Sequence, residues 1–146
     1  MAKFVFYKNE GKIYRLEGEL PPSEAYVIFD FDAETADDIV YDNGQIRLKT
    51  EAEKLAEEKQ RKLVKLKTYV ASLLAQTDYI ITKIAEAQIQ NDTAEVEALK
   101  QKYSAQLQQR EAIRQWNEQM RQSIKNAQSL DELLSLEIKF EDPTNA

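Results

Sequence analysis

"QTDYIITKIAEAQIQNDTAEVEALKQKY", residues 76–103, decides the fold of this chain of 146 residues. An apolar helical pattern ends in a polar turn near residues 90–92, and a second helical pattern follows at once. Asp92 or Thr93 can cap the second helix, and Glu95 stands three residues after Asp92 as in a capping box. No Gly or Pro interrupts the sequence between Thr50 and Pro143. The stretch therefore predicts two long helices joined by a short turn.

Both helical patterns carry a heptad-like apolar seam, with spacings of three and four residues. Thr77 fills a gap in the first seam. The first helix, from about residue 50 to 90, would reach roughly 60 Å at 1.5 Å per residue. Folding the second pattern back on the first aligns six apolar pairs whose residue numbers all sum to about 187, which predicts an antiparallel αα-hairpin. The pairs are Ile84 with Tyr103, Ile80 with Leu107, Leu73 with Ile113, Val70 with Trp116, Leu66 with Met120, and Leu63 with Ile124.

The same register places an acid beside the only base in the second seam. Asp78 and Arg110 have numbers that sum to 188. A buried ion pair between them would fix the register of the hairpin, contributing specificity more than stability. The alternative is that both side chains reach solvent at the edge of the seam.

The segments on either side of the hairpin have other patterns. Residues 1–50 are rich in aromatic and β-branched residues with turn signals between them, including Asn43-Gly44, which favours a type I′ hairpin. They predict a small antiparallel sheet with one solvated face. Residues 129–146 begin with the capping box of Ser129 and Glu132, which predicts a short helix, and continue as a strand or extended tail. The fold class is α+β: a β domain over 1–50, a helical hairpin over 51–128, and a C-terminal helix and tail over 129–146.

The composition lacks several of the side chains that catalysis most often uses. The chain has no Cys and no His, which excludes thiolate sites and the commonest general base and zinc ligand. Its three glycines leave little material for phosphate-binding loops, and its net charge of −6 disfavours nucleic acid. We expect no enzyme, cofactor, metal or membrane span. The remaining catalytic alternative is a carboxylate pair in the acidic loop, where alternate acids could also hold a divalent cation weakly; its members are Asp30, Asp32, Asp37 and Asp38.

Apolar residues outside the seams widen the stripe beyond what two helices can cover. The N-terminal sheet or a partner chain would have to cover this surplus. Trp116 and Tyr79 have the size of binding anchors, although each would also serve as a core filler. The candidate partner-binding residues are Tyr69, Leu74, Tyr79, Ile81 and Trp116.

"LLAQTDYIITKIAEA", "QQREAIRQW" and the terminal "LEIKFEDP" together resemble bacteriophage tail fibre assembly proteins and related small tail-assembly chaperones. Thr77, Asp78 and Tyr79 match one motif of that family, and Arg110 with Ile113 and Arg114 matches another. The likeness covers roughly residues 74–116 and extends more loosely to about 143. The terminal segment departs from the family, whose counterpart is richer in proline and tryptophan.

The resemblance implies a non-enzymatic helper that binds a tail fibre or receptor-binding protein through its hairpin and C-terminal region. It implies a place in the host cytoplasm, or in the virion tail if the protein is retained there. The nearest alternative is a structural subunit of the tail or baseplate, a homo-oligomer if the same helices pair between copies. An acidic inhibitor that mimics nucleic acid is a further alternative, although the basic residues in 54–67 argue against it.

Overall fold

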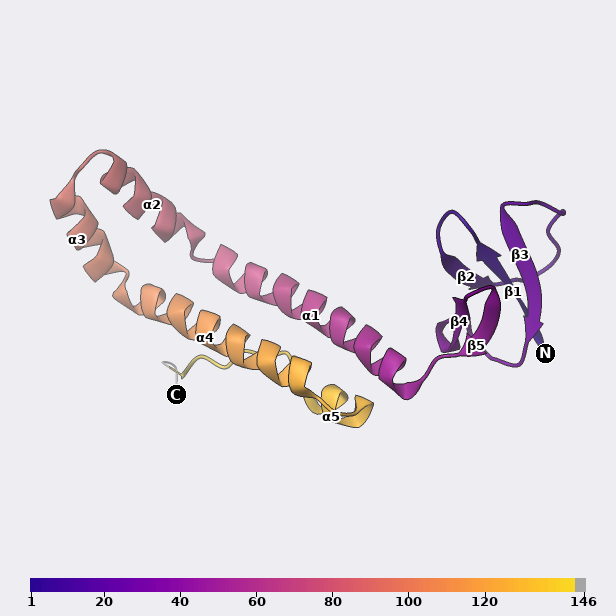
Figure 1. Ribbon diagram of the computed structural model, residues 1–146. Coiled ribbons are helices and arrows are strands. Elements are labelled where there is room, and N and C mark those ends of the chain that lie inside the picture. Colours follow the sequence, from indigo (N-terminus) through magenta and orange to yellow (C-terminus); the bar gives the residue numbers. More distant parts are fainter. Residues whose placement is uncertain (144–146) are drawn as a thin grey trace. The chain divides into compact units, whose positions relative to one another are not determined.

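The computed structural model describes residues 1–143 and divides into two compact units, Met1–Lys54 and the chain from Leu55 onward (Figure 1). The first unit contains the strands and the second contains the helices. The α+β class is therefore confirmed, with the antiparallel sheet preceding the helices.

The β unit contains two small antiparallel sheets. Strands β1 (Ala2–Tyr7), β2 (Lys12–Arg15) and β3 (Tyr26–Phe31) form one sheet in the order β2-β1-β3. A short 3-10 helix, Ala36–Asp38, precedes β4 (Ile39–Asp42) and β5 (Gln45–Leu48), which pair as a separate hairpin. Asn43 and Gly44 at its tip both have positive φ, 50° and 81°, as the predicted type I′ turn requires.

The central strand corrects the expectation of one solvated face. Phe4 and Val5 are 0% and 2% exposed, and consecutive residues of a strand point to opposite faces, so both faces of β1 are covered here. The second hairpin helps to cover this sheet, because the ring of Phe6 stacks on that of Tyr41 with centroids 4.0 Å apart. Ile39 of β4 is also buried.

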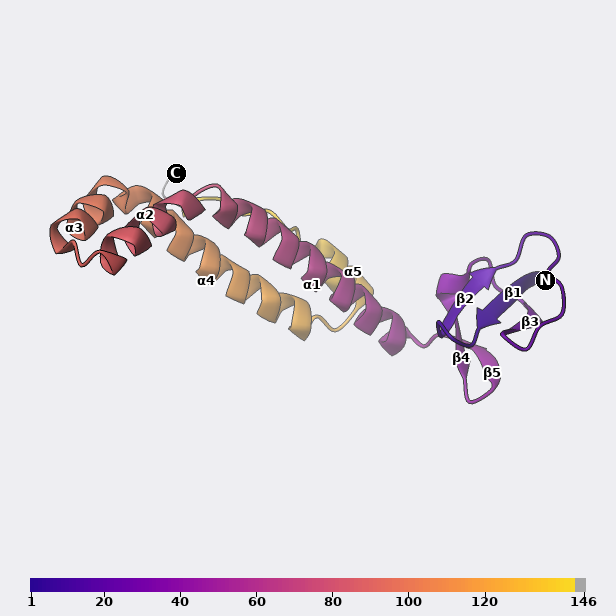
Figure 2. The same cartoon turned by 90° about the horizontal axis from the view of Figure 1, so that it is seen from above.

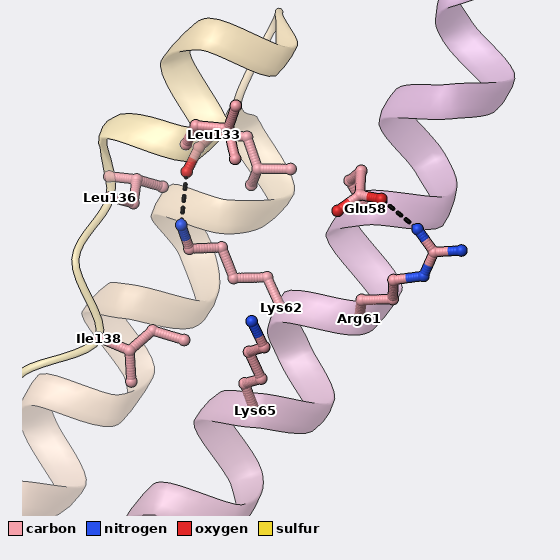
Figure 3. Close-up of a pocket in the computed structure, with 8 residues that line it drawn as sticks. Glu58, Arg61, Lys62, Lys65, Leu133, Leu136 and Ile138 are labelled. Carbon is pink, nitrogen blue, oxygen red and sulfur yellow. Dashed lines mark hydrogen bonds and ion pairs between the residues drawn. The ribbon is translucent and has the colours of Figure 1, made fainter. Parts of the chain in front are cut away.

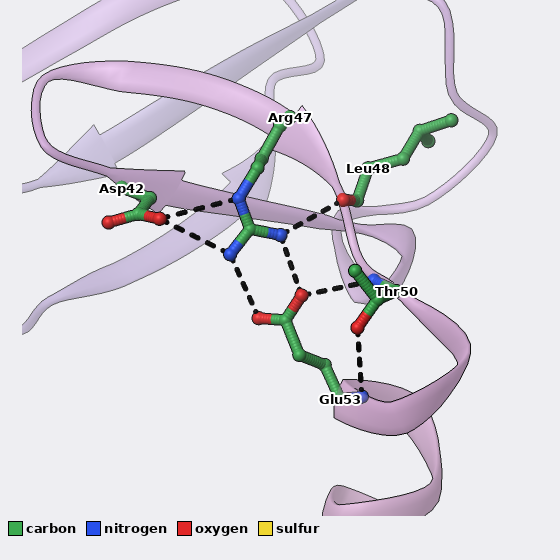
Figure 4. Close-up of polar contacts among 5 residues, drawn as sticks. All are labelled: Asp42, Arg47, Leu48, Thr50 and Glu53. Atoms are coloured by element: carbon green, nitrogen blue, oxygen red, sulfur yellow. Dashed lines mark hydrogen bonds and ion pairs between the residues drawn. The ribbon is translucent and has the colours of Figure 1, made fainter.

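A polar cluster ends the β unit at the start of α1 (Glu51–Ala75), as Figure 4 shows. The Thr50 hydroxyl accepts from the Glu53 amide at 3.1 Å, and the Glu53 carboxylate accepts from the Thr50 amide at 3.0 Å, which is a capping box. Arg47 donates to both carboxylate oxygens of Glu53, at 2.6 and 3.1 Å, and also to Asp42. The Arg47 hydrogen bond, followed by the one from Thr50, lowers the pKa of Glu53 to about 2.

The helical unit is an antiparallel hairpin, but neither arm is one continuous helix as the sequence predicted. The first arm breaks after α1, and α2 runs from Asp78 to Ile89. The second arm breaks at Tyr103, between α3 (Thr93–Lys102) and α4 (Ser104–Asn126). At the turn, Asn91 takes a positive φ of 56°, and the Asp92 side chain accepts from the Glu95 amide.

The two breaks divide the apolar core into two clusters. We call the part built from α2 and α3 with Tyr103 and Leu107 the tip, and the part built from α1, α4 and the C-terminal segment the base. Each of the six predicted seam pairs falls within a single cluster, two in the tip and four in the base, which agrees with the predicted register. The buried core of the tip is Ile80, Ile84, Ala87, Val96 and Leu99, and that of the base is Leu66, Val70, Ile113, Ile124, Ala127 and Leu133.

The C-terminal segment adds a third layer to the base. Helix α5 (Leu130–Ser135) starts at Ser129, whose hydroxyl accepts from the Glu132 amide. The chain then returns in extended form along α1 and α4 (Figures 1 and 2). It takes the extended-tail form of the prediction, and its alternate apolar residues pack against the base core; these are Leu136, Ile138 and Phe140.

Candidate partner-binding surface

The predicted contact between Asp78 and Arg110 is present at the break between α1 and α2. Arg110 Nη1 of α4 lies 3.0 Å from Asp78 Oδ1, and it also donates to the Leu74 carbonyl and the Thr77 hydroxyl, each at 2.8 Å. The Arg110 side chain is 7% exposed whereas that of Asp78 is 62% exposed. The ion pair is therefore neither wholly buried nor wholly solvated, because only the Arg110 side chain is enclosed.

Arg110 also explains why α1 stops where it does. In a continuous helix the Leu74 carbonyl would accept from the amide of Asp78. Here the Leu74 carbonyl accepts from the Thr77 amide at 3.1 Å and from Arg110. These two hydrogen bonds replace the one that the Asp78 amide would donate in a continuous helix. The guanidinium also places positive charge at the C-terminal end of α1, where the helix dipole favours it. A polar residue in an apolar seam, Thr77, was the one signal of this junction in the sequence.

Three of the candidate partner-binding residues are engaged within the base. The ring of Trp116 lies 5.7 Å from those of Tyr69 and Phe140, and the Tyr69 hydroxyl accepts from the Phe140 amide at 3.0 Å. Leu74 packs against the base core. The C-terminal segment covers Tyr69 and Trp116, a role that the sequence assigned to the sheet or to a partner, and Leu74 packs on the core, so these three side chains do not form a free surface.

The other two candidates lie on the tip and are exposed, Tyr79 by 48% and Ile81 by 40%. They do not form one patch, because two residues at about 100° each place them about 200° apart around α2. Tyr79 packs edge-on against Tyr103 with centroids 5.8 Å apart, and Lys83 lies 5.9 Å from both rings.

Ile81 belongs to a different apolar surface. Ala85 and Ile89 follow it at intervals of four residues, which places all three on one face of α2. All three are exposed, Ile89 by 80%. We call Ile81, Ala85 and Ile89 the α2 stripe. The four-residue spacing is visible in the sequence, where Ile81 and Ile89 both lie outside the seam.

The acidic residues that were the catalytic or cation-binding alternative lie in or beside β3 and in the short 3-10 helix. Residues 1–143 contain no group of three or more His, Cys, Asp or Glu side chains placed to hold a metal ion. Asp38 of the acidic loop is bound by the Thr35 hydroxyl at 3.3 Å, and Asp37 and Asp38 lie in the short 3-10 helix. Asp30 and Asp32 belong to no metal-binding group in this part of the chain.

Two further observations complete the description of the surface. In the part of the chain that the structure describes, no helix is both long and apolar enough to cross a membrane. Comparison with known proteins found no matching family model, no matching curated protein and no matching solved structure.

Proposed function

We propose that this protein is a non-enzymatic assembly factor that binds a phage tail fibre or receptor-binding protein, with the exposed face of the tip as its main contact. The observation that carries the proposal is the contrast in coverage: the base has three layers, whereas among residues 1–143 the tip cluster contains side chains of its two arms only. Ile81 and Ile89 remain exposed on it. Contiguous exposed apolar surface is a candidate protein contact, whereas single exposed apolar residues are ordinary.

The two motif segments that resemble the tail fibre assembly family meet at one place. Thr77 and Asp78 come from the first segment and Arg110 from the second, and all three share the hydrogen bonds of the α1–α2 junction. This contact supports a structural role for the motifs, which is to hold the tip in a fixed direction on the base. A rigid tip loses less conformational freedom when a partner binds, which favours affinity.

The partner in this proposal is a large β-rich fibre chain, shielded in the host cytoplasm until it assembles. The alternative proposal is a structural subunit of the tail or baseplate, in which the α2 stripe contacts a neighbouring subunit or a second copy. Both readings use the same surface, and they differ in where the protein is found after assembly.

Co-purification tests the proposal. Tagged wild-type protein, expressed in cells that produce the phage, should retain a fibre chain identified by mass spectrometry. The double variant Ile81→Asp with Ile89→Asp should lose it, because it places two charges in the contact. The control is Val64→Asp, which puts one such charge at a residue that is also exposed, by 64%, but lies on α1.

Capture of a fibre chain by wild type and control, and not by the double variant, supports the proposal. Equal capture by all three proteins, or no fibre chain with any of them, contradicts it. Finding the protein at fixed stoichiometry in purified particles would instead favour the structural subunit.

A further inference from the structure

A second surface, on the base, combines cationic and aliphatic groups in one pocket (Figure 3). The pocket has a volume of about 270 Å³ and lies between α1 and the C-terminal segment. Helix α1 lines one side with charged residues and α5 with its extension lines the other with aliphatic ones. The lining residues are Glu58, Arg61, Lys62 and Lys65, and Leu133, Leu134, Leu136 and Ile138.

The charged side carries an excess of positive charge, since three cations face one carboxylate for a net charge of +2. Glu58 is already engaged by Arg61. Lys62 Nζ donates to the Leu133 carbonyl at 2.7 Å, and burial together with the nearby Lys65 lowers the pKa of Lys62. Lys65 is exposed and makes no hydrogen bond or ion pair within the described residues. The charged side, which we call the wall of the pocket, thus has cationic charge that the protein's own groups do not neutralise.

The opposite side offers an apolar contact. Leu133 is 1% exposed and anchors α5 in the base core, while the next residue, Leu134, is 69% exposed. Leu136 and Ile138 are half-buried beside it. An aliphatic side chain entering the pocket would cover Leu134 and would place any adjoining acid close to Lys65.

We propose that this pocket binds an acidic segment of a partner polypeptide in which a carboxylate adjoins an aliphatic side chain. Charge complementarity selects the acid, and the leucine and isoleucine side chains select the aliphatic neighbour. The volume lies just below the usual range of roughly 300–1,000 Å³ for small-molecule sites, so it suits one or two side chains of a peptide.

This proposal goes beyond the tip contact, because the pocket lies on the base and does not require the partner to be a tail fibre. Its test uses synthetic peptides, so its failure and a failure of the proposed function are distinguishable. Lys62 is not a suitable test residue, because its bond to the Leu133 carbonyl also holds α5 in place.

Fluorescence anisotropy with a short labelled peptide of alternating glutamate and leucine provides the test. Lys65→Glu should weaken binding at least about tenfold, because it replaces the unpaired cation of the wall with a negative charge that repels the acidic peptide. The matched control is Lys67→Glu, with the same charge change on the same helix and a side chain directed about 200° away. We expect that control to change affinity less than about twofold.

The apolar requirement has its own pair of variants. Leu134→Ser should weaken binding, whereas Val64→Ser, at a similarly exposed residue outside the pocket, should not. Peptides with glutamine in place of glutamate, or serine in place of leucine, should bind more weakly than the parent. Circular dichroism of each variant checks that the helices are retained.

Several results would overturn the proposal. One is equal affinity of the Lys65→Glu and Lys67→Glu proteins, and another is no binding of the parent peptide at millimolar concentration. Tighter binding of single-stranded DNA with the same dependence on Lys65 would assign the wall to nucleic acid. Self-association of the wild type that Lys65→Glu abolishes, without peptide binding, would assign the pocket to a second copy.

Discussion

The base and the tip are built from the same two arms of one hairpin, yet among the described residues only the base has a third layer over part of its apolar surface. In the base, Tyr69 and Trp116 lie beside Phe140 of the returning segment. In the tip, the α2 stripe has no such layer from the described residues, and Ile89 stays 80% exposed. A widened apolar stripe on a helix therefore does not by itself locate a binding site. The position of the covering segment decides which part of the stripe remains free.

The largest expected effects come from cavities placed in each region. Leu66→Ala in the base and Ile80→Ala in the tip both truncate side chains that are at most 1% exposed, and each should cost roughly 3 kcal/mol locally. Hydrogen exchange should rise over α1 and α4 for Leu66→Ala, but over α2 and α3 for Ile80→Ala. Identical exchange patterns for the two variants would show that base and tip unfold as one unit.

Replacing Arg110 at the α1–α2 junction should affect the tip more than the base. Arg110→Met keeps most of the apolar volume but removes the donor to Leu74, Thr77 and Asp78, and we expect a loss of about 2 kcal/mol. Exchange should rise most in α2. Arg114→Met is the control, because the Arg114 side chain is 56% exposed and its one ion pair among the described residues is with Glu111 at 3.8 Å. Equal urea midpoints for both variants and wild type would remove the junction from the account of the fold.

Loosening the third layer should affect the base alone. Phe140→Ala removes the ring that contacts Trp116, with an expected cost of about 1–2 kcal/mol. Trp116 is the only tryptophan, so its emission should shift to the red as water reaches it. Lys139→Ala, at the exposed neighbouring position, should leave the spectrum unchanged. A red shift with the control, or none with Phe140→Ala, would mean that this segment does not cover the base.

The smallest effect concerns the first turn of α1, which belongs to the β unit and not to the apolar clusters of the hairpin. The folded pKa of Glu53 is about 2, below its ordinary value of 4.5. Its contribution to stability is therefore complete above about pH 4.5 and is lost as the pH falls towards 2. In Glu53→Gln the urea midpoint should fall less as the pH is lowered over this range. The midpoint is measured from the NMR signals of residues 39–50. Glu51→Gln, in the same turn, should retain the wild-type slope.

The sequence predicted the hairpin, its register and the Asp78–Arg110 contact, because these follow from the spacing of side chains along the helices. It also predicted the helix N-caps at Asp92 and Ser129 and the Asn43-Gly44 turn, whose signals lie within a few residues. It missed the helix breaks, since neither Thr77 nor Tyr103 is a strong helix breaker and the break at Thr77 depends on Arg110, more than thirty residues away.

The candidate surface was harder to predict for the same reason. Helical spacing places Tyr69 and Leu74 outside the two-helix seam and Trp116 within it, but it does not show which of these side chains a third segment covers. The covering layer comes from "LEIKF" at residues 136–140, and only the fold brings it beside Tyr69 and Trp116. Tyr79 and Ile81 are close in sequence, yet the geometry of α2 directs them to different sides.

Isoleucine methyl NMR, recorded while the co-purified fibre chain is added, tests the central claim most directly. If the uncovered tip is the contact, the methyl signals of Ile81 and Ile89 should shift or broaden, while those of Ile124 and Ile138 in the base stay in place. Shifts at Ile138 with Ile81 and Ile89 unchanged would contradict the claim, because the partner would then act on the covered base.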